Sequence, residues 1–296
     1  MQEGAIYMGY LAPLSNHDVL EAMNVRKITA FATEFIPRIS RAQSMDTLSS
    51  MATLAGYKAV LMAANHLGKI FPLLMTAAGS IPPATTFVLG AGVAGLQAIA
   101  TAKRLGSKVE AFDPRPAVEE QVKSLGATFV HMEVPEENVE TSGGYAKQQS
   151  DAFLLAEQEA IGARLPKVDV IITTAAIFGK KAPILITEEM VKLMRPGSVI
   201  VDLAVEGGGN CELTESGEVV VKHGVTIIGT LNLPAKLSIN GSGMMAKNLL
   251  NLFKNLFQAE DNSLDFEEEI TAGACIVHGG EVKNEMVKNS MTGGNA

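Results

Sequence analysis

Three glycines form the sharpest chemical signal in the amino-acid sequence. Gly90, Gly92 and Gly95 have the spacing G-x-G-x-x-G, and they stand between an apolar run and a helical pattern that begins at Val93. In such a unit the first glycine permits a tight turn, the second lets a pyrophosphate approach the backbone, and the third lets helix and strand pack closely. The N–H groups and the positive dipole at the helix start favour phosphate. The pattern predicts a dinucleotide site, and a structural glycine turn is the alternative.

A carboxylate follows the glycines at the sequence spacing that is typical of a dinucleotide site. Asp113 ends the next predicted strand, 18 residues after Gly95. At that place a carboxylate accepts a hydrogen bond from a ribose 2′-hydroxyl and repels a 2′-phosphate, which favours NAD(H). Arg115 lies two residues further on and would suit the 2′-phosphate of NADP, so that alternative stays open.

Two further strand ends are expected at the same crevice. Thr174, Ala175 and Ala176 follow one predicted parallel strand, and Asp202 lies near the end of another, shortly before a run of three glycines. The carboxyl ends of parallel strands line the ligand crevice of such folds. We expect the first group to touch the cofactor and Asp202 to be structural, with a catalytic role for Asp202 as the alternative.

No group for proton transfer is evident. A dehydrogenase that acts on a hydroxyl or an amine needs an acid or base, typically His or Lys. The five histidines, at positions 17, 66, 131, 223 and 278, are scattered and form no recognisable constellation. The pattern therefore predicts a protein that holds a cofactor without an obvious proton donor.

Composition restricts the possible classes of protein. With 24 Lys and Arg against 32 Asp and Glu, the chain carries a net charge of −8, which argues against a nucleic-acid partner. Cys211 and Cys275 are far apart and predict neither a disulfide scaffold nor a metal site, so we expect buried thiols and no metal. No leader or membrane-spanning pattern is visible, and the sequence predicts a soluble, intracellular protein of two domains.

Strands and helices alternate from residue 84 onward, which implies parallel βαβ units. The predicted strands cover residues 85–89, 108–112, 128–130, 168–173, 198–203 and 225–229, and the predicted helices 93–105, 116–125, 151–164 and 187–194. Loops are expected over 133–150 and 232–243, and short strands and turns over 264–287. Two long helices, 47–71 and 244–257, bracket the region.

These elements predict an α/β fold. A Rossmann-like, doubly wound parallel-sheet domain with linking helices at its ends (51–244) is inserted in a second, incomplete Rossmann-like domain (1–50 and 245–296).

One segment carries a family resemblance. Residues 38–46, with the letters RISRAQSMD, and the following Leu48-Ser49-Ser50 closely resemble the nicotinamide-contacting loop of the NAD(H)-binding domain I (α subunit) of proton-translocating NAD(P) transhydrogenase, in the alanine dehydrogenase/transhydrogenase family. Residues 92–106, 144–147, 201–204 and 248–251 are similar to that family as well. The family's N-terminal part is expected to be absent from this chain.

The resemblance implies roles for single residues. Catalytic residues that orient the dihydronicotinamide would be Arg38, Gln43, Asp46 and Ser49. Cofactor-binding residues would be Arg38, Ser40, Arg41, Gly90, Gly92, Val93, Gly95, Asp113, Arg115, Gly144, Tyr145, Thr174, Ala175 and Ala176, with Tyr145 on a lid loop. The alternatives are a helix cap around Asp46 and an incidental aromatic at Tyr145.

The resemblance also implies a reaction. Hydride would pass directly between two nicotinamide rings, so no acid or base is needed and catalysis is mostly juxtaposition. NADP(H) would be bound by a partner component, protons would cross a membrane component, and the chain would be a homodimer on the cytoplasmic (or matrix-equivalent) face of an energy-transducing membrane. An alanine dehydrogenase-like amino-acid dehydrogenase and a non-catalytic NAD-binding module are the alternatives.

Overall fold

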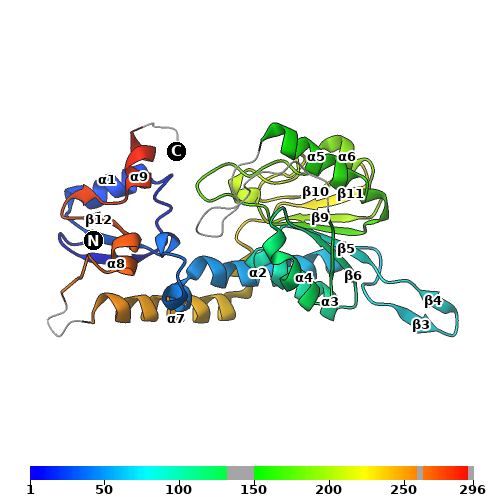
Figure 1. Ribbon diagram of the computed structural model, residues 1–296, viewed down its shortest axis with the longest axis horizontal. Helices are drawn as coiled ribbons and strands as arrows, with labels where there is room; N and C mark the ends of the chain where they lie inside the picture. Colours follow the sequence, from blue (N-terminus) through cyan, green and yellow to red (C-terminus); the bar gives the residue numbers. More distant parts are fainter. Residues whose placement is uncertain (132–149, 259–262, 293–296) are drawn as a thin grey trace. The chain divides into compact units, whose positions relative to one another are not determined.

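The computed structural model describes residues 1–131, 150–258 and 263–292 (Figure 1). It consists of two compact units, one formed by Met1–Met51 and Ser238–Ala296 and the other by Ala52–Leu237. Gly144 and Tyr145, the residues expected on a lid loop, lie outside the described residues. We describe each unit separately.

A seven-stranded sheet forms the larger unit (Figure 1). In spatial order its strands are β10 (Val219–Lys222), β11 (Val225–Ile228), β9 (Val199–Asp202), β8 (Val170–Thr173), β5 (Thr85–Leu89), β6 (Lys108–Phe112) and β7 (Thr128–Phe129). All neighbouring pairs are parallel except β10 with β11. The six parallel strands have the order of a dinucleotide-binding sheet, in which the direction of winding changes between β5 and β8. Strand β10 has no counterpart in the sequence-based prediction.

Helices cover both faces of this sheet, with α2, α3 and α4 on one face and α5 and α6 on the other (Figure 1). They are α2 (Thr47–His66), α3 (Val93–Arg104), α4 (Glu119–Ser124, after a 3-10 turn at Pro116–Val118), α5 (Asp151–Gly162) and α6 (Glu188–Val191). Side chains of β5 alternate between two apolar cores: Val88 packs in the first with α2, α3 and α4, and Phe87 in the second with α5 and α6. The arrangement confirms the α/β fold class and the Rossmann-like parallel sheet.

A two-stranded hairpin follows α2. Its strands are β3 (Leu74–Thr76) and β4 (Gly79–Ile81), paired antiparallel. The sequence predicts a helix up to residue 71, and that prediction is wrong because α2 ends at His66, just before Gly68 and Pro72. The residues between His66 and β3 form a turn instead, in which Phe71 packs in the apolar core beside α2.

The smaller unit has a four-stranded mixed sheet. Its order is β1 (Ile6–Gly9), β2 (Thr29–Ala32), β12 (Cys275–His278) and β13 (Glu281–Val282). Strands β1 and β2 are parallel, and β12 is antiparallel to both of its neighbours. Its helices are α1 (His17–Val25), α7 (Ser238–Leu256), α8 (Glu269–Ala274) and α9 (Glu285–Met291). The sequence patterns miss β1, α1 and β2.

Two expectations for this unit are wrong. The loop expected over 232–243 is helical from Ser238 onward, so α7 begins six residues earlier than predicted, and Gly241 and Gly243 lie inside it. The tail is more helical than expected because side chains of Glu268 and Asn284 cap α8 and α9. In the described part of the chain, no helix is long and apolar enough to cross a membrane.

Candidate nucleotide site

The turn between β5 and α3 needs glycine at two positions. Gly90 has a φ of +97°, and a Cβ atom there would lie 2.4 Å from the Thr174 hydroxyl oxygen. A Cβ atom on Gly95 would lie 1.9 Å from the Gly90 carbonyl oxygen. Real Cβ atoms do not approach other atoms so closely, so the turn and the packing of α3 on β5 depend on these two glycines.

Open space lies over the start of α3. Gly92 is its N-cap residue, and a Cβ atom there would meet no atom within 4 Å. The Val93 side chain beside it is 38% exposed. The helix start is therefore open to a phosphate group, which the N–H groups and dipole of an α-helix N-terminus favour.

Strand β8 brings a second segment to the same turn. The Thr174 N–H donates to the Leu89 carbonyl (2.8 Å), and the Thr174 hydroxyl donates to the Gly90 carbonyl (3.1 Å). Thr174 and Ala175 therefore lie at the point where the sheet changes its direction of winding, as expected for crevice residues.

A buried asparagine, which the sequence patterns missed, holds this segment. Asn210 is fully buried; its amide oxygen accepts the Ala175 N–H (3.0 Å), and its amide nitrogen donates to the carbonyls of Ala175 and Pro183 (2.8 Å each). The only sequence signal is its place directly after the three glycines that follow Asp202.

Asp202 anchors the next strand end. The fully buried carboxylate accepts hydrogen bonds from the hydroxyls of Thr173 and Thr214 (3.0 and 2.8 Å) and from three backbone N–H groups, those of Ala204, Asn210 and Cys211. A carboxylate that accepts so many hydrogen bonds is held in one orientation. These contacts are those of a structural anchor, and the absence of a catalytic role for Asp202 stays a prediction.

Asp113 meets the glycine turn directly. Its carboxylate accepts the Ala91 N–H (2.7 Å) and a bidentate pair of hydrogen bonds from the Arg115 guanidinium (2.8 Å each). The Asp113 side chain is 3% exposed and that of Arg115 is 14% exposed. Asp113 favours NAD in the sequence and Arg115 would suit NADP. In the structure the two residues form one buried ion pair at the edge of the turn.

A buried acid lies near this pair. Glu157 on α5 is 3% exposed, and its Oε2 atom has no hydrogen-bond partner among the described residues. Burial, with a smaller effect of the Asp113 charge, raises the pKa of Glu157 to about 7. Sequence patterns give no signal for this group, because Glu157 occupies one position of an ordinary amphipathic helix.

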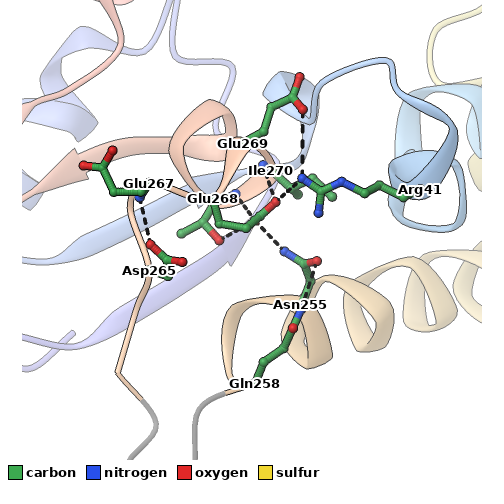
Figure 2. Close-up of polar contacts among 9 residues, drawn as sticks. Arg41, Asn255, Gln258, Asp265, Glu267, Glu268, Glu269 and Ile270 are labelled. Atoms are coloured by element: carbon green, nitrogen blue, oxygen red, sulfur yellow. Dashed lines mark hydrogen bonds and ion pairs between the residues drawn. The ribbon is translucent and has the colours of Figure 1, made fainter.

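Ala176 follows Ala175 in the larger unit and is exposed. The predicted residues between positions 38 and 49 lie in the smaller unit. Asp46 precedes α2 and accepts hydrogen bonds from the Ser49 N–H (2.8 Å) and hydroxyl (2.5 Å), which is the geometry of a helix cap. Arg38, Ser40 and Gln43 are exposed. Arg41 is also exposed, and its guanidinium pairs with Glu268 (Figure 2). Within the described ranges, no cluster of His, Cys, Asp and Glu could hold a metal ion.

The predicted residues thus form two groups. The structure brings Gly90, Gly92, Gly95, Asp113 and Thr174 together, and Ala175, Val93 and Arg115 adjoin them. Asp46 and Ser49 are brought together in the other unit. Whether any of these residues contacts a nucleotide stays a prediction.

Two family models match the chain: "Alanine dehydrogenase/PNT, N-terminal domain" over residues 1–55 and "Alanine dehydrogenase/PNT, C-terminal domain" over residues 59–285. The chain belongs to the alanine dehydrogenase/PNT family. Membership confirms the resemblance found in the sequence.

Relatives within the alanine dehydrogenase/PNT family differ in their similarity to this chain. A Rhodospirillum rubrum protein named as the first part of "NAD(P) transhydrogenase subunit alpha" is 51% identical over 285 residues, which cover 95% of this chain and 74% of that protein. The crystal structure of a transhydrogenase from Sinorhizobium meliloti has a TM-score of 0.83 at 43% identity and covers 95% of this chain and 76% of that one. "Alanine dehydrogenase 2" of Staphylococcus aureus is more distant, at 29% identity over 242 residues, 79% of this chain and 59% of that protein.

Proposed function

We propose that this chain is the NAD(H)-binding subunit of a proton-translocating transhydrogenase. The main support is the combination of the glycine turn and Asp113 with the segment 38–49, in a chain whose similar relatives are named as transhydrogenase α subunits. A partner component would hold NADP(H), and a membrane component would carry the protons. The chain would then lie at a membrane surface on the side of the NADP-binding component.

The glycine turn fits a pyrophosphate. Open space at Gly92 lies beside the start of α3, so a phosphate could reach the backbone without displacing a side chain. Thr174 and Ala175, held by Asn210, would border the nicotinamide side of the crevice. NAD(H) is the proposed ligand because the Asp113 carboxylate follows β6, the place from which such folds bind the ribose; Asp113 would exchange an Arg115 hydrogen bond for a ribose hydroxyl.

The reaction needs alignment more than acid–base chemistry. Bound NADH supplies a hydride, with both electrons of one C–H bond, to the oxidised ring of NADP⁺, so one nucleotide is oxidised as the other is reduced. The residues of this chain would bind NADH, orient its ring and exclude water. Holding two rings at reacting distance removes several kcal/mol from a barrier, on the order of 7–11 kcal/mol in well-oriented systems.

Gly92→Ala tests nucleotide binding without disturbing the fold. The φ of Gly92 is −74°, and its Cβ would have free space, so the variant should fold normally. We expect NADH affinity to fall about tenfold or more, because the added methyl group occupies the path of the pyrophosphate. Gly68→Ala is the matched control, since Gly68 is exposed and its Cβ also meets no atom within 4 Å. Equal NADH affinity in both variants would contradict the assignment of the site.

Two assays then separate the candidate reactions. Hydride transfer from NADH to an NADP analogue, in the presence of an NADP-binding component, is expected for a transhydrogenase. Pyruvate- and ammonia-dependent oxidation of NADH is expected for an alanine dehydrogenase. A protein that binds NADH and shows neither reaction would be a binding module.

The exposed hairpin supports a homodimer. Leu74 and Ile81 are 42% exposed and Met75 is 75% exposed, all on the two strands β3 and β4. An isolated two-stranded hairpin is marginally stable in water, and apolar side chains on it are stabilised when a second chain covers them. We infer that a second copy of this chain packs against the hairpin.

A further inference from the structure

The 3-10 turn η2 (Ser40–Met45) carries Gln43 and leads to Asp46. It is six residues long. Runs of 3-10 helix longer than about three or four residues are uncommon, because their hydrogen bonds have poor geometry. Neighbouring elements must therefore hold η2 in shape.

Helix α7 holds the end of the turn. The Ser44 carbonyl accepts two hydrogen bonds, from the side-chain amides of Asn248 (2.8 Å) and Asn251 (3.1 Å). These residues are three positions apart, so they lie on one face of α7. Since Ser44 directly follows Gln43, the two amides fix the backbone beside a proposed nicotinamide residue.

An ion pair holds the start of the turn. The Arg41 guanidinium lies 2.5 Å from Oε1 of Glu268, which caps α8 (Figure 2). Glu268 also accepts hydrogen bonds from the Ile270 and Thr271 N–H groups and from Asn255 of α7. Burial alone would raise the pKa of Glu268, but these donors lower it to about 2, so the carboxylate stays charged for Arg41.

Apolar packing closes the inner side of η2. Ala42 is 1% exposed and Met45 is 7% exposed, and both belong to a core that includes Leu252 of α7 and Ile270 of α8. The same two helices therefore supply both the apolar contacts and the polar contacts of η2. The polar contacts hold Arg41 and Ser44, and the apolar contacts hold Ala42 and Met45.

We propose that Arg41, Asn251 and Glu268 are positioning residues that hold η2 in the conformation from which Gln43 and Asp46 reach the nicotinamide. The inference rests on the proposed function for the role of the turn. It assigns Arg41 a different task from the cofactor contact that the family resemblance implies, because its guanidinium is tied to Glu268.

Amide hydrogen exchange tests the positioning in the protein alone. In Asn251→Ala and Arg41→Met, exchange at residues 40–46 should become about tenfold faster, while exchange in β2 and β12 stays unchanged. Glu269→Gln is the control, because Glu269 is exposed and 3.9 Å from Arg41. The proposal is overturned if the turn exchanges as in the parent, or if Glu269→Gln has the same effect.

Hydride transfer with the NADP-binding component gives the second measurement. We expect both variants to slow transfer about tenfold or more, with NADH affinity within about twofold of the parent, because misplacement affects the reacting geometry more than binding. Arg41→Lys should restore part of the rate. A tenfold loss of NADH affinity in Arg41→Met would place Arg41 on the cofactor and overturn the proposal. If the parent itself transfers no hydride, the proposed function fails, and the exchange result still decides the positioning.

Discussion

The buried acid on α5 makes stability depend on pH. Glu157 is 3% exposed, and its pKa is raised from 4.5 to about 7, first by burial and then by the charge of Asp113. Between these two pKa values the folded protein keeps a proton that the unfolded chain has lost. Stability therefore falls as the pH rises from about 4.5 to about 7, and the loss is complete above that range.

The size of the effect follows from the two pKa values. They differ by about 2.5, and each pKa unit corresponds to about 1.4 kcal/mol. The charged form of Glu157 thus costs the folded state up to about 3 kcal/mol at about pH 8. Glu157→Gln removes the charge and nearly keeps the volume of the side chain. We expect the variant to resemble the parent near pH 5 and to be more stable by up to about 3 kcal/mol near pH 8.

Urea denaturation at about pH 5 and about pH 8 measures this difference. Glu159→Gln is the matched control, because Glu159 lies on the same helix and is exposed. The control should show a difference of at most about 0.5 kcal/mol at both pH values. If the Glu157→Gln difference is the same at both pH values, Glu157 is not held neutral by the fold and the reasoning is refuted.

Three other features give direct predictions. Burial raises the pKa of both Cys211 and Cys275 to about 11, so neither thiol should react with a disulfide reagent at about pH 8 until denaturant is added; rapid labelling of the native protein would contradict this. Met75→Asp should convert the proposed dimer to a monomer in light scattering, whereas Val25→Asp, at a residue 83% exposed on α1, should not. Gly95→Ala should lower stability by about 1–3 kcal/mol in thermal unfolding, because its Cβ would meet the Gly90 carbonyl; an unchanged Tm would show that the turn relaxes freely.

The glycine turn and the parallel sheet were predictable because their signals are local. Gly90, Gly92 and Gly95 lie within six residues. Each short run of apolar residues, such as that of β5, predicts a buried strand without information from the rest of the chain. The hairpin β3–β4 was not predictable, since each of its strands has only three residues and all of them are exposed, so no buried face leaves a pattern in the sequence. Local patterns describe an element well when packing does not override them.

The residues that order the site were harder to find for a different reason. Asn210 and Ala175 are 35 positions apart, and α7 bonds Ser44 across more than 200 positions. Such pairs can be identified only when the order of the strands and the buried faces of the helices are known. The family resemblance identified residues of the turn η2 and covered the segment 248–251, but it assigned no role to the two amides of that segment or to the Glu268 carboxylate.

The buried polar groups support a site built for alignment. Asp202, Asn210 and Asp113 all accept hydrogen bonds from backbone N–H groups at the crevice strand ends, and Asn248 donates to a backbone carbonyl of the turn η2. A buried side chain that binds backbone fixes the shape of a loop, because breaking the bond leaves an unpaired polar group at a cost of about 1–3 kcal/mol. Proton transfer would require a titratable group free to reach a substrate. Direct transfer of hydride between two rings requires only that the loops around them are held in place, and that is the task we propose for these residues.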